Sequence, residues 1–292
     1  MNPFRLPAAT QIGHAHLQVS DLERARIFYK DFIGFKEISV DGETAVLSAA
    51  GQLPAHILLT VRAGARPKPP RTTGLYHVAI RFPNRRELAR LFRHLLEQAW
   101  QFQGFANHLV SEALYLADPD GNGLELYTDR PREQWRWQNG QVEMTTDPLD
   151  VDDLLRESEN DPAPWSGVHP NTDIGHVHLH VADLQKAEAF YRGVLGFDVM
   201  QRSYPGALFI SAGGYHHHIG LNIWAGKGAP PPPPDAVGLL SFSIRVPDET
   251  TLKILQERLH AAGLPFAEKG SSMNGPVILT RDQDGNGVEL SY

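Results

Sequence analysis

The feature that most constrains the fold is an internal duplication. The segment IGHAHLQVSDLERARIFYKDFIGF, which begins at Ile12, returns as IGHVHLHVADLQKAEAFYRGVLGF from Ile174. The two copies also end alike, with DPDGNGLELY from Asp118 and DQDGNGVELSY from Asp282. Such copies indicate that one structural unit is repeated along the chain.

Each copy divides once more. The segments GLYHVAIRFPNRRELARLFRHLLEQ from Gly74 and GLLSFSIRVPDETTLKILQERLHAAG from Gly238 repeat the pattern of the openings. This predicts four modules, at about 12–64, 74–129, 174–226 and 238–292. Proline-rich joints, which cannot continue a helix or a central strand, separate the modules within each copy at 66–71 and 230–234.

The domain boundary is predicted in the middle of the chain. A length of 292 residues suits two ordinary domains. Between the copies, hydrophobic periodicity is poor and Asp, Glu and Pro are frequent, which is typical of a linker. We therefore predict an N-terminal domain at 1–140, a linker at 141–172 and a C-terminal domain at 173–292.

Within a module, the pattern predicts a strand followed by a helix. Residues 14–19 alternate, with Ala15, Leu17 and Val19 on one face. Ser20 and Asp21 are both candidates for the N-cap of the helix that follows. Because a helix covers only one face of a sheet, the polar face of each strand is expected to line a cavity.

Composition excludes several classes of function. The chain has 27 basic and 34 acidic side chains and a formal net charge of −7, so neither nucleic acid nor an anionic membrane is an expected partner. A run long enough to span a membrane is missing, as is a secretory signal, so we expect a cytoplasmic protein. There is no cysteine, so imidazole and oxygen ligands would have to hold any metal, and the chain has 14 histidines.

Strand phase selects three candidate metal ligands, His14, His77 and Glu125. Each is predicted to point toward the cavity from the first or last strand of a module of the N-terminal half. Taken singly, an inward His or Glu is more often a hydrogen-bonded core residue. Their coincidence in phase favours a divalent metal, because an unpaired buried Glu would be costly. Two imidazoles and one carboxylate leave coordination positions open, which indicates catalysis.

The four modules, the HxHLxVxDL openings and the DPDGNGxEL endings resemble the vicinal oxygen chelate superfamily over nearly the whole chain. The resemblance implies an α+β fold of four βαβββ modules, paired into two domains that are each an incomplete β-barrel with helices outside. Within the superfamily the chain is most similar to type I extradiol dioxygenases of the catechol 2,3-dioxygenase class. His14, His77 and Glu125 match the positions of the family's metal ligands.

The same resemblance assigns three catalytic residues. His56, in AHILLT, matches the histidine that acts as acid and base, and Tyr115, ten residues before Glu125, matches the active-site tyrosine. His108 lies near a second active-site histidine, although its register is open. The alternatives without a catalytic role are that Tyr115 is an ordinary aromatic residue of a β-strand and that His108 is a surface loop residue.

The C-terminal half is predicted to be catalytically degenerate. Ser241 stands where the N-terminal half has His77, and Leu279 stands where it has Tyr115. A second metal site of different geometry stays open, because this half is rich in histidine. Its candidate ligands are His176, His178, His180, His216, His218 and Glu289.

The sequence thus predicts metal-dependent extradiol cleavage of a small aromatic diol by dioxygen, with Fe(II) or Mn(II) as cofactor. One alternative is a glyoxalase-like isomerase or thiol transferase, although such a site usually adds a second Glu and HILLTV offers none. Another is a non-enzymatic binding or resistance protein. The sequence does not identify the catechol, and it leaves the oligomeric state open, a homo-oligomer included.

Overall fold

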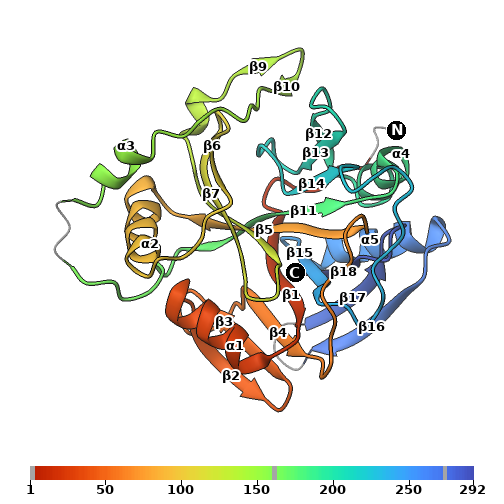
Figure 1. The fold of residues 1–292 in the computed structure, drawn as a ribbon. Helices are drawn as coiled ribbons and strands as arrows, with labels where there is room; N and C mark the ends of the chain where they lie inside the picture. Colours follow the sequence, from red (N-terminus) through yellow and green to blue (C-terminus); the bar gives the residue numbers. More distant parts are fainter. Residues whose placement is uncertain (1–3, 160–162, 272–274) are drawn as a thin grey trace.

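The computed structural model describes residues 4–159, 163–271 and 275–292. Its strands form two eight-stranded sheets and one two-stranded ribbon (Figure 1). We call one the terminal sheet, because it combines the first and last modules, and the other the central sheet, because it combines the second and third. No helix in the described parts of the chain is long and apolar enough to cross a membrane.

The terminal sheet has the order β16-β17-β18-β15-β1-β4-β3-β2. The first module supplies β1 (Gln11–Val19), α1 (Leu22–Ile27), a π-helical turn η1 (Phe28–Phe32), β2 (Lys36–Asp41), β3 (Thr44–Ser48) and β4 (Ile57–Val61). The fourth module supplies β15 (Gly238–Arg245), α5 (Glu249–Ala261), β16 (Phe266–Ser271), β17 (Gly275–Arg281) and β18 (Gly287–Ser291). The two modules meet where β1 pairs antiparallel with β15.

The central sheet has the order β12-β13-β14-β11-β5-β8-β7-β6. The second module supplies β5 (Gly74–Phe82), α2 (Arg85–Glu97), β6 (Gly104–Asn107), β7 (Ser111–Ala117) and β8 (Gly123–Asp129). The third module supplies β11 (Asp173–His180), α4 (Leu184–Glu188), a π-helical turn η3 (Ala189–Val194), β12 (Asp198–Gln201), β13 (Ala207–Ser211) and β14 (Ile219–Asn222). The two modules meet where β5 pairs antiparallel with β11.

The predicted fold class is confirmed, because each module runs strand, helix and three strands. In every module the first strand pairs parallel with the last, and the remaining strands follow antiparallel. The predicted pairing of modules, however, is wrong. We expected 1–140 and 173–292 to form separate domains, but the first module completes its sheet with the fourth and the second with the third.

The segment predicted as a plain linker has structure of its own. After η2 (Arg132–Gln134) come the ribbon strands β9 (Trp137–Gln138) and β10 (Gln141–Val142), and then α3 (Val151–Arg156). Helix α3 packs on α2, and Asp153 accepts a hydrogen bond from Arg85 at 2.6 Å. Val142 joins a small apolar cluster with Val110, Trp135 and Met200. The segment is therefore part of the folded body around the second module.

The two proline-rich joints lie side by side where the chain crosses between the sheets. The backbone N–H of Arg66 donates to the carbonyl of Asp235 at 2.9 Å, and that of Val237 donates to the carbonyl of Arg66 at 2.9 Å. Both joints connect the terminal sheet with the central sheet, in opposite directions. This contact between the joints fits modules that pair across the two halves of the sequence.

The repeated DPDGN turn fixes the start of each closing strand. Asp118 accepts the backbone N–H groups of Asp120 and Asn122, both at 2.9 Å, and the hydroxyl of Tyr29 at 3.1 Å. Helix α1 begins as predicted, because Asp21 accepts the backbone N–H of Arg24. The turn therefore ties the first module to the second and positions the strand that follows it.

Each sheet combines one module from the N-terminal half of the sequence with one from the C-terminal half. Residues 1–140 expressed alone should therefore fail to fold as a monomer. That fragment would leave the edges of β1 and β5 unpaired and its two half-barrels open. We expect no cooperative thermal unfolding transition by circular dichroism, and recovery of a transition when residues 141–292 are co-expressed. A stable, monomeric 1–140 fragment would contradict the observed pairing.

Candidate metal centre and catalytic cavity

Three side chains of the central sheet converge on one point. They are His77 of β5, Glu125 of β8 and His176 of β11, and their ligand atoms all lie within 4.8 Å of one another. His77 Nε2 lies 2.9 Å and His176 Nε2 lies 3.2 Å from Glu125 Oε2. All three residues are buried.

Strand register explains this convergence. Strand β5 lies between β8 and β11, and Ala79 of β5 is opposite both Glu125 and His176. Side chains that are opposite one another in register point to the same face, which is also the face of His77, two residues before Ala79. Ala79 is fully buried and small, so it leaves room above it for the three larger side chains.

The electrostatics of this cluster favour a cation. Burial alone would raise the pKa of Glu125, but His176 and His77 hold that pKa well below its ordinary value. Burial lowers the pKa of His176 to about 4, so its imidazole is neutral near pH 7. An anionic carboxylate therefore lies buried between imidazoles, and these are the protonation states that bind a metal.

Two buried ring nitrogens of the cluster that lack hydrogen-bond partners also favour a metal ion. Despite its contact with Glu125, His77 Nε2 is not aligned for a hydrogen bond, and neither it nor His176 Nδ1 has a hydrogen-bond partner within the described residues. Buried polar atoms without partners are rare in native structures. Two imidazoles and one carboxylate fit a divalent ion such as iron or manganese.

His14 is not part of this cluster, which corrects the predicted ligand set. It belongs to the terminal sheet, where its Nε2 lies 3.4 Å from Glu289 Oε2. Ser241 donates to Glu289 Oε1 at 2.5 Å. The reason is the module pairing: the complete triad is His77, Glu125 and His176, and the broken one is His14, Ser241 and Glu289.

The terminal sheet thus carries a degenerate copy of the cluster. Burial would raise the pKa of Glu289, but His14 and Ser241 lower it to about 2. Leu279 is the cross-strand neighbour of Glu289, as Tyr115 is of Glu125. Degeneracy was predicted for the C-terminal half, but Ser241 and Leu279 share the terminal sheet with His14, so the incomplete ligand set belongs to that sheet.

The predicted alternative of a second histidine-rich metal site is also not assembled. Its candidate ligands are separated, since His176 belongs to the complete triad and Glu289 to the terminal sheet. His178 Nε2 lies 3.0 Å from Asn222 Nδ2, and His180 Nδ1 lies 2.6 Å from Asn222 Oδ1, so one amide satisfies both rings. Within the described residues, only the cluster of His77, Glu125 and His176 brings such groups together.

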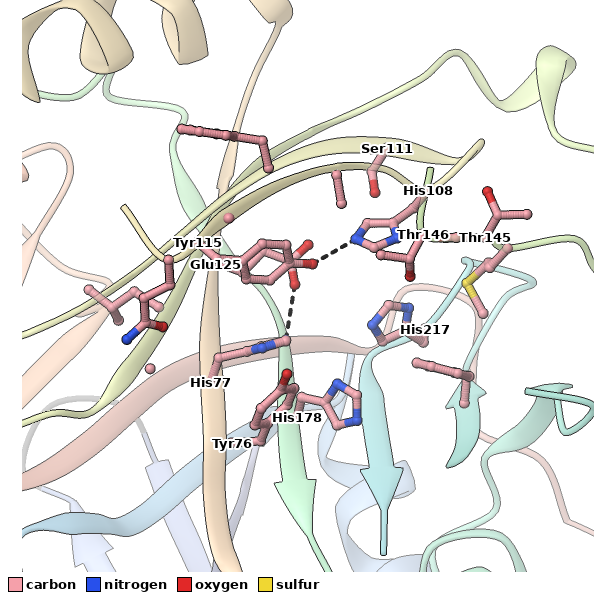
Figure 2. Close-up of a pocket in the computed structure, with 18 of the residues that line it drawn as sticks. Tyr76, His77, His108, Ser111, Tyr115, Glu125, Thr145, Thr146, His178 and His217 are labelled. Carbon is pink, nitrogen blue, oxygen red and sulfur yellow. Dashed lines mark hydrogen bonds and ion pairs between the residues drawn. The ribbon is translucent and has the colours of Figure 1, made fainter. Parts of the chain in front are cut away.

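A cavity of about 660 Å³ opens above the triad (Figure 2). His77 and Glu125 line it directly, whereas His176 is buried next to His217 of the cavity wall and is not itself a lining residue. Met144, Thr145 and Thr146, from the segment predicted as a linker, supply part of another wall. The cavity is therefore built by the second module, the third module and the connection between them.

Tyr115 and His108 both lie on this cavity, where they form a hydrogen-bonded pair. His108 Nε2 lies 2.6 Å from the Tyr115 hydroxyl, and His108 Nδ1 lies 2.5 Å from the carbonyl oxygen of Thr145. A carbonyl only accepts, so Nδ1 carries a proton, and with a single ring proton His108 accepts the tyrosine proton at Nε2. Burial and Glu125 raise the pKa of Tyr115 well above its ordinary value, so its hydroxyl stays protonated.

His56 does not reach the cavity, so its predicted catalytic role is wrong for this centre. It precedes β4 as His218 precedes β14. In both sheets the ring Nδ1 accepts a backbone N–H, from Ala49 at 3.1 Å for His56 and from Ala212 at 3.2 Å for His218. The duplication thus identifies His56 and His218 as equivalent structural residues.

His217 was not predicted from the sequence, and its ring lies in the cavity wall (Figure 2). Its ring centroid is 4.0 Å from that of His176, and its Nδ1 lies 2.8 Å from His216 Nδ1. Within the described chain its Nε2 has no hydrogen-bond partner. The three consecutive histidines at 216–218 carried this signal. When His218 is aligned with His56, His217 matches Ala55 and so has no histidine counterpart in the first module.

Paired βαβββ modules around a buried His-His-Glu cluster define the class of this protein. A family model described as the Glyoxalase/Bleomycin resistance protein/Dioxygenase superfamily matches residues 11–126 and 173–290. The chain belongs to this superfamily, and the predicted resemblance is confirmed.

Two individual relatives within this superfamily are dioxygenases by name. The chain is 45% identical to a catechol-2,3-dioxygenase of Bacillus subtilis (strain 168), over 90% of this chain and 92% of that protein. It is 28% identical to biphenyl-2,3-diol 1,2-dioxygenase 3 of Rhodococcus globerulus, over 48% of this chain and 75% of that protein. Both relatives are in line with the extradiol class that the sequence indicated.

Solved structures share the fold at low sequence identity. A Bacillus subtilis subsp. subtilis str. 168 protein has a TM-score of 0.67 at 14% identity, with 99% of this chain and 86% of that chain covered. Glyoxalase I from Zea mays has a TM-score of 0.57 at 16% identity, with 97% and 92% covered. These two likenesses support the fold alone.

The corrected ligand set predicts which histidines matter for metal binding. His77→Ala and His176→Ala should each weaken Fe(II) or Mn(II) binding at least about tenfold, because each removes one ligand. His14→Ala and Ser241→Ala should leave affinity and stoichiometry unchanged. Anaerobic titration calorimetry with elemental analysis would measure both. Loss of metal from His14→Ala with retention in His176→Ala would restore the original ligand set.

Proposed function

We propose that this protein is an extradiol dioxygenase that opens the ring of a catechol-type substrate with dioxygen. The proposal assigns Fe(II) or Mn(II) as the cofactor, with His77, Glu125 and His176 as ligands. When bound, such an ion supplies redox coupling between an aromatic diol and dioxygen. The observation that carries the proposal is the position of this triad, which lies at the base of a cavity that also contains Tyr115, His108 and His217.

His217 is assigned as the base that takes the substrate's hydroxyl proton. Burial lowers its pKa well below the ordinary value, so the ring is neutral, and its Nε2 is free of partners in the described chain. A neutral imidazole beside the triad suits proton transfer at this point. The role first predicted for His56 therefore passes to His217.

Tyr115 and His108 are assigned to orient the substrate oxygens. The tyrosine hydroxyl lies beside Glu125 and donates its single proton to His108, so its oxygen is left to accept a hydrogen bond from a substrate hydroxyl. His108 is held in place by Thr145, so it fixes the direction of that hydroxyl. A hydrogen-bonded pair that is oriented before the substrate binds costs little reorganisation during the reaction.

The isomerase alternative has less support from the residues of the cavity. A glyoxalase-like site was expected to add a second carboxylate ligand. Among the described residues that line the cavity, Glu125 is the only carboxylate. A non-enzymatic protein that binds no metal would not explain the buried Glu125 carboxylate or the unpaired ring nitrogens of His77 and His176.

The test is an oxygen-electrode assay of anaerobically iron-loaded protein with catechol and substituted catechols. We expect stoichiometric oxygen uptake and a yellow ring-cleavage product, with at least about a hundredfold loss of kcat in His217→Ala, because a general base contributes on this scale. His14→Ala should retain full activity. Metal-loaded protein that consumes no oxygen with any catechol would refute the proposal.

The cavity mouth favours an apolar substituent on the catechol. Tyr76, Phe105 and Trp224 line the cavity and are 40%, 37% and 45% exposed, and Trp224 lies edge-on to Tyr76 with ring centroids 5.5 Å apart. Cavities of roughly 300–1,000 Å³ suit ligands larger than one ring. We therefore assign the mouth to an alkyl or aryl group extending from the ring.

This assignment predicts selectivity at Trp224. Trp224→Ala should raise KM for an aryl-substituted catechol about threefold to tenfold, the scale of one aromatic contact, and change KM for unsubstituted catechol little. Trp137→Ala is the matched control, because Trp137 is 49% exposed and is not among the residues lining the cavity. Steady-state oxygen uptake measures both values. Equal effects on the two substrates would argue against an aromatic subsite.

A further inference from the structure

A chain of three side chains leads from Asp129, a partly exposed residue at the end of β8, through buried His216 to His217 in the cavity wall. His216 Nε2 lies 2.8 Å from Asp129 Oδ1, and His216 Nδ1 lies 2.8 Å from His217 Nδ1. His216 is fully buried, and Asp129 ends β8, the strand that carries Glu125. The chain therefore joins the last strand of the second module to the loop before β14 of the third.

The chemistry of the partners fixes where the protons lie. Arg81 approaches Asp129 Oδ2 at 3.3 Å and Tyr215 donates to Asp129 Oδ1 at 3.1 Å, so this carboxylate is surrounded by donors and only accepts. His216 Nε2 must then be protonated, and with one proton on each ring His216 accepts at Nδ1. His217 consequently donates from Nδ1, and the lone pair of its Nε2 is left for the cavity.

We propose that Asp129 and His216 are positioning residues that hold His217 in its basic tautomer, and that His216 accepts the Nδ1 proton of His217 when the substrate protonates Nε2. This inference rests on the proposed function, since it needs a diol in the cavity. The substrate hydroxyl would transfer its proton to His217 Nε2, and the O–H electron pair would stay on the substrate oxygen. The Nδ1 proton of His217 would pass to His216 Nδ1, so the positive charge would lie next to Asp129.

The duplication supplies an internal comparison. In the terminal sheet, the positions that match His216 and His217 are Pro54 and Ala55, directly before His56. The structural histidine is thus kept in both sheets, at His56 and His218, whereas the pair is found only beside the complete triad. The backbone contact of the structural histidine does not account for this difference, because His56 and His218 make that contact in both sheets.

The first variant is Asp129→Asn, which reverses the hydrogen-bond direction with little change in shape. Arg81 only donates, so the new amide oxygen should face Arg81 and the new NH₂ should donate to His216 Nε2. His216 would then donate from Nδ1, and His217 would carry its proton on Nε2. Nitrogen-15 NMR of histidine-labelled protein without metal should report Nε2 of His217 as unprotonated in the parent protein and protonated in the variant.

The kinetic consequence should be a large loss of kcat at nearly constant KM. We expect a loss of about 10²-fold to 10⁴-fold, the scale of general-base catalysis and of tautomer reversal in an Asp-His pair, with KM within about threefold. A residue that served only in packing would not reverse the tautomer of His217. His216→Gln, which also breaks the chain, is the second variant in case Asp129→Asn does not fold.

The matched control is His218→Asn, which alters the neighbouring ring but not the chain. Its amide oxygen can still accept from Ala212, so full activity and a native His217 tautomer are expected. The proposal is overturned if Asp129→Asn or His216→Gln folds, binds metal and keeps kcat within about threefold, or if parent His217 is protonated at Nε2. Absence of ring cleavage in the parent protein with the expected tautomers would instead count against the proposed function.

Discussion

The antiparallel pairing of β5 with β11 is the contact on which the candidate centre depends. It places Ala79 opposite His176, while the parallel pairing of β5 with β8 places Ala79 opposite Glu125. The three ligands thus come from adjacent strands of one sheet, around a residue too small to fill the space. Neither half of the sequence contains all three, so the centre exists only when the second and third modules are joined.

The sequence predicted the modules well and their pairing wrongly, and the reason is physical. Alternation and capping are local, and they fixed the strand of His14, the N-cap at Asp21 and the four βαβββ units. Which strand pairs with β5 is instead decided by the antiparallel contact between two modules that are far apart in the sequence. Strands β1 and β11 begin with almost the same residues, IGHAHL and IGHVHL, so local pattern could not decide which one meets β5. His77 and Glu125 were identified because they share a module. The third ligand, His176, could be identified only by knowing that β5 pairs with β11.

The duplication also separates histidines that hold the fold from histidines that face the cavity. His56 and His218 occupy matching positions and accept matching backbone N–H groups, so their shared feature is structural. His217 has no histidine counterpart, and it is the ring that lies beside His176. Conversely, Ser241 in place of His77 leaves Glu289 with a hydroxyl and His14 as partners. The same backbone therefore carries a complete and a broken ligand set.

The structure of the centre implies that metal binding and assembly are coupled. The buried Glu125 carboxylate lies between histidines from the two joined modules, and without a cation its charge opposes closure of the β5–β11 seam. A ligand that binds only the folded state stabilises it by RT ln(1 + [L]/Kd), which is about 2.7 kcal/mol at a hundredfold excess over Kd. In this chain that free energy would act at the seam between the second and third modules. In the terminal sheet Glu289 is partly exposed and accepts a hydrogen bond from Ser241, so water and this hydroxyl solvate its charge and the pairing of β1 with β15 does not need an ion.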